Sequence, residues 1–160
     1  MEIMGAVGIV ALILAVAIPS FNMMRRDARV SQFTDTLETL QGCFQEHVAI
    51  NRGYPADASP GVVPGTMDKF LPRRFSWAEE TPLGGHWNWD LGCPGIPYAA
   101  ISVSSAAGAV EDIGTFEKVD VRIDDGDLTT GSFRRNLGDP ERRYFLVLQE
   151  NTNSPWGQVP

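Results

Sequence analysis

Four aspartates close together in the sequence are the side chains best suited to ligand chemistry. Asp120, Asp124, Asp125 and Asp127 surround Gly126. Calcium prefers such carboxylate oxygens and takes about 6 to 8 oxygen ligands. Their spacing differs from that of an EF-hand loop, so we expect a solvated helix end and turn here. Calcium binding is the alternative, and we expect no other cofactor.

The remaining polar residues do not indicate a catalytic site. His47 and His86 have no metal-ligand spacing with each other or with the cysteines, and the common hydrolase, zinc-protease and phosphate-loop motifs are absent from the sequence. We expect both histidines to be packing or surface residues. Trp87 and Trp89 could stack on a ligand, but they share one face of a predicted strand, which favours core packing. The sequence predicts that the chain is not an enzyme.

A single carboxylate precedes a long apolar run at the N-terminus. Every residue from Ile3 to Ile18 is apolar or glycine, and Glu2 stands immediately before them. A membrane-spanning helix needs about 20 mostly apolar residues, so residues 1–24 could form a short anchor. An acid inside such a helix is costly unless it is paired or near the interface, which indicates a function for Glu2. Pro19 should kink the helix or melt it locally.

The combination of Glu2 and Pro19 resembles a known family. Glu2-Ile-Met, the apolar run and Ala17-Ile18-Pro19-Ser20-Phe21 are similar to the N-terminal helix of type IV pilins and type II secretion pseudopilins. In that family an acidic residue precedes a proline by seventeen positions, as Glu2 precedes Pro19. The similarity covers roughly residues 1–33. A plain signal anchor is the competing interpretation.

The resemblance implies a structural subunit of a type IV pilus-like filament or of a type II secretion pseudopilus. Its partners would be identical or homologous pilin subunits, the inner membrane before assembly, and the assembly machinery. The subunit would move from the bacterial inner membrane into a filament at the cell surface or across the periplasm. Family members lose a leader peptide and are methylated at the new N-terminus, at a position that here would precede Met1. The alternative function is a membrane-anchored, exported binding protein that does not polymerise.

The resemblance also assigns roles to individual residues of the N-terminal helix. Glu2 and Pro19 would act in assembly. The apolar positions would pack in the centre of the filament, and we name six of them as its core: Ile3, Val7, Val10, Ile13, Leu14 and Ile18.

Charge divides the chain into two parts. The whole chain has a net charge of −7, to which the first thirty residues contribute +1 and the remainder −8. An acidic globular part argues against nucleic-acid binding. We therefore expect a hydrophobic transmembrane or filament-core helix over residues 1–26, and an amphipathic helix with a globular head over residues 27–160.

Apolar spacing predicts that the first helix continues far past the apolar run. Val30, Phe33, Leu37, Leu40 and Phe44 recur at steps of three and four residues, as on one face of a helix. A helix of about fifty residues would be roughly 75 Å long. Gly53 and Pro55 supply the stop.

The rest of the chain predicts a small antiparallel sheet lying on that helix. Strands are expected after Gly84-Gly85, with Trp87, Trp89 and Leu91 on one face, and over residues 98–103 and 144–149. Residues 109–125 fit a helix or a strand, and we favour the helix. Thr66 is expected to cap a short helix over residues 67–71. The predicted fold class is α+β, with a pilin-like helical spine and a sheet head on its C-terminal half.

Cys43 and Cys93 are the only cysteines in the chain. Two thiols in an exported segment can form a disulfide, which would join the sheet to the helical spine. Two buried free cysteines are the alternative, because an even count does not show that the two are close. We predict the disulfide.

Overall fold

The protein is described by a computed structural model, which covers residues 2–93, 96–104, 110–136 and 143–150. Within these ranges the side chains of residues 2–14, 16, 17, 19, 97 and 150 are not described. The elements in chain order are α1 (Glu2–Asn51), the 3₁₀ helix η1 (Met67–Lys69), β1 (His86–Cys93), β2 (Ile96–Ser104), α2 (Ile113–Ile123), β3 (Phe133–Arg135) and β4 (Tyr144–Glu150).

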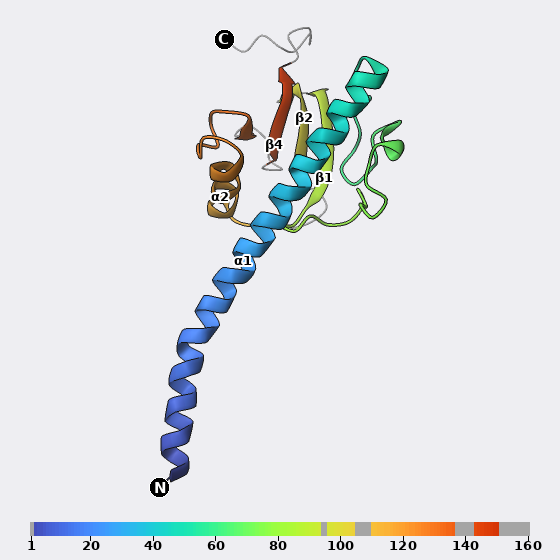
Figure 1. The fold of residues 1–160 in the computed structure, drawn as a ribbon. Coiled ribbons are helices and arrows are strands. Elements are labelled where there is room, and N and C mark those ends of the chain that lie inside the picture. The colour runs from blue at the N-terminus through green and yellow to red at the C-terminus, as the bar shows by residue number, and fades with distance from the viewer. Residues whose placement is uncertain (1, 94–95, 105–109, 137–142, 151–160) are drawn as a thin grey trace.

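The first helix is the spine that the apolar spacing predicts. α1 contains 50 residues and remains helical through Pro19, so the local melting expected at this proline does not occur in the single chain. Figure 1 shows α1 as one curved helix whose second half lies on the sheet. Arg52, with φ of 58°, takes the left-handed conformation that ends the helix, one residue before the predicted Gly53. Within the described part of the chain, no helix combines the length and apolarity needed to cross a membrane.

The sheet is antiparallel throughout, with the strand order β1-β2-β4-β3. The three predicted strands are confirmed as β1, β2 and β4. In the register, Trp89 lies opposite Ile101, and Ile101 lies opposite Leu146. The edge strand β3 was not predicted, because three residues are too few to show an alternating pattern. The α+β fold class is therefore confirmed.

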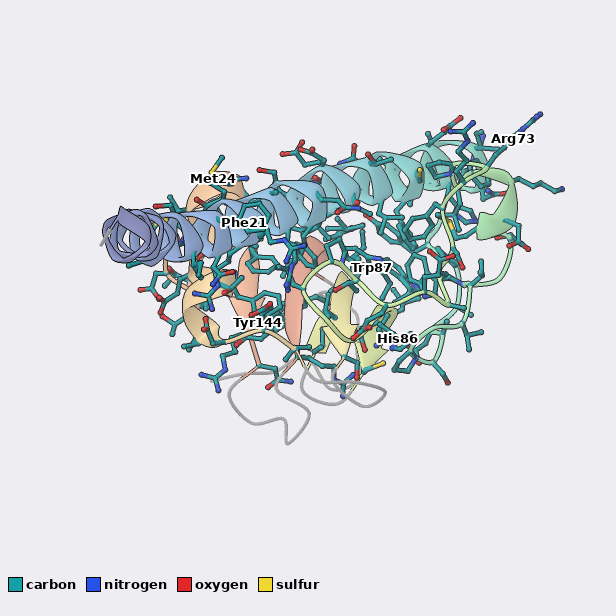
Figure 2. All side chains as sticks on the ribbon, turned by 90° about the horizontal axis from the view of Figure 1, so that it is seen from below. Phe21, Met24, Arg73, His86, Trp87 and Tyr144 are labelled. Carbon is teal, nitrogen blue, oxygen red and sulfur yellow. The ribbon has the colours of Figure 1, made fainter. Side chains whose placement is uncertain are left out.

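Aromatic stacking joins α1 to β1. Phe33 stacks on Trp87 with a centroid distance of 5.0 Å, and Phe44 stacks on Trp89 at 4.1 Å. Figure 2 shows Trp87 between the ribbon of α1 and the strands. All four side chains are buried, so the predicted core face of β1 is confirmed. The alternative, in which the tryptophans form a stacking platform for a ligand, is wrong because their rings are already covered by the helix.

The second helix closes the other side of the core. Asp112 caps α2, since its carboxylate accepts a hydrogen bond from the Thr115 amide at 2.9 Å. Phe116 stacks on Tyr144 of β4 at 3.7 Å and meets the edge of Phe33 at 5.8 Å. The helix expected within residues 109–125 is confirmed. The strand alternative fails because Phe116 and Val119, three residues apart, are both buried whereas Val121 is exposed.

The long connection between α1 and β1 is tied to α1 through His47. This buried imidazole contacts the Gly53 carbonyl oxygen at 3.0 Å and the Thr66 hydroxyl at 2.7 Å. The prediction that the Thr66 side chain caps η1 is therefore wrong. The φ of Thr66, 71°, is also unlike that of an N-cap residue. A tertiary contact with a residue 19 positions earlier in the chain has replaced the local one. The prediction that His47 is a packing residue is confirmed.

Two phenylalanines on α1 allow a matched test of this core. Phe33 is fully buried, whereas Phe21 is 58% exposed. We expect Phe33→Ala to lower the free energy of unfolding by about 3–5 kcal/mol, because it removes a buried ring and leaves a cavity. Phe21→Ala should change it by less than about 0.5 kcal/mol. Urea unfolding of the full chain in mild detergent measures both, and equal losses would place the core elsewhere.

Candidate functional site

The exposed N-terminal half of α1 is the most conspicuous feature outside the head. Val30 is the first buried residue of the chain among those whose side chains are described. Before it, four large apolar side chains are more than half exposed: Ile18 (56%), Phe21 (58%), Met23 (65%) and Met24 (69%). Figure 1 shows this half of α1 extending away from the sheet, and Figure 2 shows Phe21 and Met24 on it. Exposed apolar side chains gathered on one element mark a surface that binds another apolar surface.

Most of the residues predicted to assemble the filament have side chains outside the described part of the chain. The side chains of Glu2 and Pro19 lie outside the described residues, as do those of five predicted core positions, Ile3, Val7, Val10, Ile13 and Leu14. Their backbone belongs to α1. Ile18 is the one predicted filament-core residue whose side chain is described, and it is exposed in the single chain.

The base of the exposed helix is fixed to α2 by ion pairs. Arg26 contacts the Asp112 carboxylate at 2.6 Å, Arg29 contacts Glu111 at 2.5 Å, and Lys118 contacts Asp27 at 3.0 Å. Hydrogen bonds from the Thr115 hydroxyl and amide, with a smaller effect of Arg26, lower the pKa of Asp112. Exposed pairs of this kind stabilise a fold by about 0–1 kcal/mol each. Together they connect the middle of α1 to α2 and to the two residues that precede it.

Sequence reasoning missed these ion pairs. The partners are separated by more than 80 positions, for example 86 for Arg26 and Asp112. The available signal was only that Arg26 and Arg29 lie one turn apart on a helix, and that Glu111 and Asp112 begin another. No local pattern indicates that the middle of α1 meets the residues that precede α2.

The structure contains two free cysteines and therefore not the predicted Cys43–Cys93 disulfide. The pairing of β1 with β2 shifts between Leu91 and Cys93, and the Cys93 thiol donates a hydrogen bond to the Asp57 carboxylate at 2.9 Å. Burial, followed by that carboxylate, raises the pKa of Cys93 to about 12. Burial also raises the pKa of Cys43. Both thiols are therefore protonated at neutral pH and are poor nucleophiles.

Among the described residues, Asp57, Asp90 and Cys93 form one of two clusters in which potential ligand atoms lie within 4.8 Å of one another. Asp90 is buried, but both of its oxygens have partners. Arg143 contacts one oxygen at 2.9 Å, and the Ser102 hydroxyl donates to the other. Burial raises the pKa of Asp90 in spite of these contacts. The cluster is a satisfied polar network on the sheet, and the sequence had not singled it out.

The second cluster contains three of the four predicted calcium candidates. The structure brings the ligand atoms of Asp120, Asp124 and Asp125 within 4.8 Å of one another. Asp127 instead accepts hydrogen bonds from the amide and hydroxyl of Thr129, at 2.9 Å and 2.6 Å. Gly126 has a φ of 84°, the left-handed conformation that glycine favours, but α2 already ends at Ile123 with Asp124 as its C-cap, so Gly126 lies in the turn beyond the helix end.

Comparison of the chain with known protein families, with characterised proteins and with solved structures gives no match.

The Asp90–Arg143 pair gives a test of the polar network. We expect Arg143→Met to lower the free energy of unfolding by about 3–5 kcal/mol, because it leaves the Asp90 carboxylate buried beside no cation. The double variant Arg143→Met/Asp90→Asn should recover a large part of that loss, since the buried charge is then removed as well. Urea unfolding of the full chain in detergent checks both values. A loss below about 1 kcal/mol in the single variant would contradict the pairing.

Proposed function

We propose that the chain is a structural subunit of a type IV pilus-like filament or of a type II secretion pseudopilus. The observation that carries this proposal is the division of α1 into two halves. Its second half completes the core of a folded head, whereas its first half presents apolar side chains that the described part of the head leaves uncovered. Polymerisation through the first half would bury that surface.

Burial of apolar surface is the driving force for assembly in this proposal. Full burial of a side chain such as Phe21 or Met24 contributes about 1.5–3 kcal/mol. Each subunit would contribute several such side chains to a bundle of helices, together with the apolar run from Ile3 to Ile18. Before assembly, the lipid of the inner membrane would cover the same surface. The head would then remain on the outside, where its acidic surface keeps it soluble.

Glu2 has a separate role in the proposed assembly, which is to select the register between neighbouring helices. Its carboxylate would be poorly solvated among apolar helices, where an unpaired charge is strongly unfavourable. Pairing with the terminal amine of the next subunit would remove that cost in one axial position only. A chain that serves merely as a monomeric anchor has no evident use for this residue, and for this reason we prefer the filament to a non-polymerising binding protein.

The ion pairs at the base of α1 suit a subunit of a filament. Arg26 and Arg29 attach the helix to the two residues that immediately precede α2, and the aromatic stacks attach it to β1. Attachment at two places prevents the head from pivoting about the spine. All heads would therefore keep the same orientation relative to the filament axis, as a regular helical lattice requires.

Substitution of Glu2 tests the filament proposal. We expect Glu2→Ala to leave the head folded but to reduce filament yield roughly tenfold or more, since about 1.4 kcal/mol per subunit contact already changes an equilibrium constant tenfold. Glu38→Ala, which removes an exposed acid on the half of α1 that lies on the head, is the matched control and should assemble normally. Electron microscopy, with the subunit identified from side-chain density, counts the filaments. Normal filaments from Glu2→Ala would remove the argument for polymerisation.

A truncated chain tests whether the head folds alone. A fragment of residues 27–160 lacks the apolar run but keeps Phe33, Phe44 and the sheet that packs on them. We expect it to be monomeric and to unfold cooperatively, because its core lies within one chain. Light scattering and thermal circular dichroism measure these properties. A fragment that forms only aggregates would show that the head needs neighbouring subunits.

A further inference from the structure

A basic hollow lies where the exposed half of α1 meets the head. It encloses about 490 Å³, and among the described residues four cations and one carboxylate line it: Arg25, Arg26, Arg29, Lys118 and Glu111. At about 30 Å³ for each water molecule it holds roughly 15 waters, which is more room than one phosphate group needs. The whole chain has a net charge of −7, so these cations are concentrated in an otherwise acidic protein.

Arg25 is a cation of this hollow without a carboxylate partner. Arg26, Arg29 and Lys118 each contact at least one carboxylate, whereas no described salt bridge involves Arg25. Its guanidinium instead lies over the Phe21 ring, 4.9 Å from the ring centroid. Stacking covers one face of the guanidinium and leaves the N–H groups at its edge free to donate. Four cations and their three carboxylate partners leave a net charge of +1 here.

The paired cations also keep donors for a further ligand. An ammonium group carries three N–H donors and a guanidinium five. In the described contacts, Lys118 uses one donor on Asp27, and Arg29 uses one nitrogen on Glu111. The remaining donors come from two different helices, so an anion with oxygens in several directions suits them better than a planar carboxylate does. Phosphate is such an anion, and arginine and lysine are its usual protein partners.

Apolar side chains border the hollow on its N-terminal side. Met23 lines it, and Phe21 and Met24 are exposed on the same segment of α1. Figure 2 shows both of these residues on this part of the helix. A ligand that matches the cations and the apolar side chains together has an anionic head and an apolar tail, as a phospholipid has.

The position of the hollow along α1 suits the headgroup layer of a bilayer. From Glu2 to Arg25 the helix is continuous and rises by about 35 Å, at 1.5 Å per residue. The hydrocarbon core of a bilayer is about 30 Å thick. When Glu2 lies at one edge of this core, Arg25 therefore reaches the phosphates of the opposite leaflet. Basic residues at that depth bind anionic headgroups.

We propose that Arg25, Arg29 and Lys118 bind the phosphate of an anionic phospholipid, a role that rests on the proposed function because it belongs to the subunit in the membrane. The acyl chains would lie along Met23 and the apolar residues that precede it. An acidic surface of a second subunit is the competing partner, but it would leave the apolar border of the hollow unmatched. A bound lipid would hold the unassembled subunit at a fixed depth in the bilayer.

Native mass spectrometry of the full chain in dodecyl maltoside tests the proposal. The chain is mixed with equal amounts of phosphatidylglycerol and phosphatidylcholine, and the lipids that remain bound are counted. We expect phosphatidylglycerol to be retained about fivefold over phosphatidylcholine, which is the effect of one unpaired cation near an anionic headgroup. Equal retention of the two lipids would overturn the proposal.

Inorganic phosphate distinguishes a lipid site from a site for free phosphate. In excess, it should lower the retention of phosphatidylglycerol no more than sodium chloride of the same ionic strength does, because it lacks the acyl chains. A specific loss of the lipid in inorganic phosphate would overturn the assignment to a phospholipid.

Two arginine variants provide a matched test of the site. Arg25→Gln should bring the retention ratio close to one while the head remains folded, because this side chain is exposed and without a carboxylate partner. Arg73→Gln makes the same charge change at an exposed position and should keep the parental ratio. Figure 2 shows Arg73 at the far end of the head from Met24. A parental ratio in Arg25→Gln would overturn the proposal.

Filament yield separates this proposal from the proposed function. Glu2→Ala should lose filaments but keep the preference for phosphatidylglycerol, so a failure of the filament proposal would leave the lipid count to be decided by itself. Arg25→Gln chains that keep the lipid preference but form no filaments would show that Arg25 contacts another subunit, and would overturn lipid binding at this site.

Discussion

The stacking of α1 on β1 is the interaction on which the rest of the structure depends. Phe33 and Phe44 each lie nearly parallel to a tryptophan ring, with interplanar angles of 18° in both pairs. Such aromatic pairs contribute about 0.5–1.5 kcal/mol each beyond the apolar area that they bury. Phe33 also meets Phe116, so the same residue joins the helix to the sheet and to α2. A spine that is held at two separate stacks cannot rotate about its own axis, and this fixes which residues of its first half face outward.

The carboxylates of the head show two ways in which a protein manages buried charge. Asp90 is paired with Arg143 and bonded to Ser102, so its burial serves the architecture of the sheet. Asp120 is buried as deeply, but neither of its oxygens has a hydrogen-bond partner among the described residues, and the carboxylates of Asp124 and Asp125 lie close to it. The difference lies in the partners rather than in the burial. The charged pairs at the base of α1 are a third case, because they are exposed, individually weak and important mainly for orientation.

The proposed filament surface and the acidic loop lie in different parts of the chain. The first is the half of α1 that the head does not cover, and the second follows the end of α2. Glu111 and Asp112 immediately precede α2 and form ion pairs with the spine, and Asp120 lies at the other end of this helix. One short helix therefore links the attachment of the spine to the acidic loop.

The sequence by itself determined the features that repeat locally. The helical spacing of Val30, Phe33 and Leu37 predicted the spine and its buried face, and the alternation around Trp87 and Trp89 predicted the inner face of β1. The aspartates and glycine at 124–127 predicted a turn after α2, which ends at Ile123. These predictions succeeded because the side-chain period of a helix or a strand determines which nearby residues face the core, and those residues are apolar.

Only the tertiary structure decided which distant side chains meet. Thr66 contacts His47 instead of capping a helix, and the Cys93 thiol donates to Asp57 instead of bonding to Cys43. Arg26 binds Asp112. The tertiary structure also buried Asp120, whereas Asp125 and Asp127 stay in the exposed turn that the sequence had favoured. The physical reason is the same in each case. A long-range contact depends on the relative placement of whole elements, which is fixed by the packing of the core and leaves no period or spacing in the residues that make the contact.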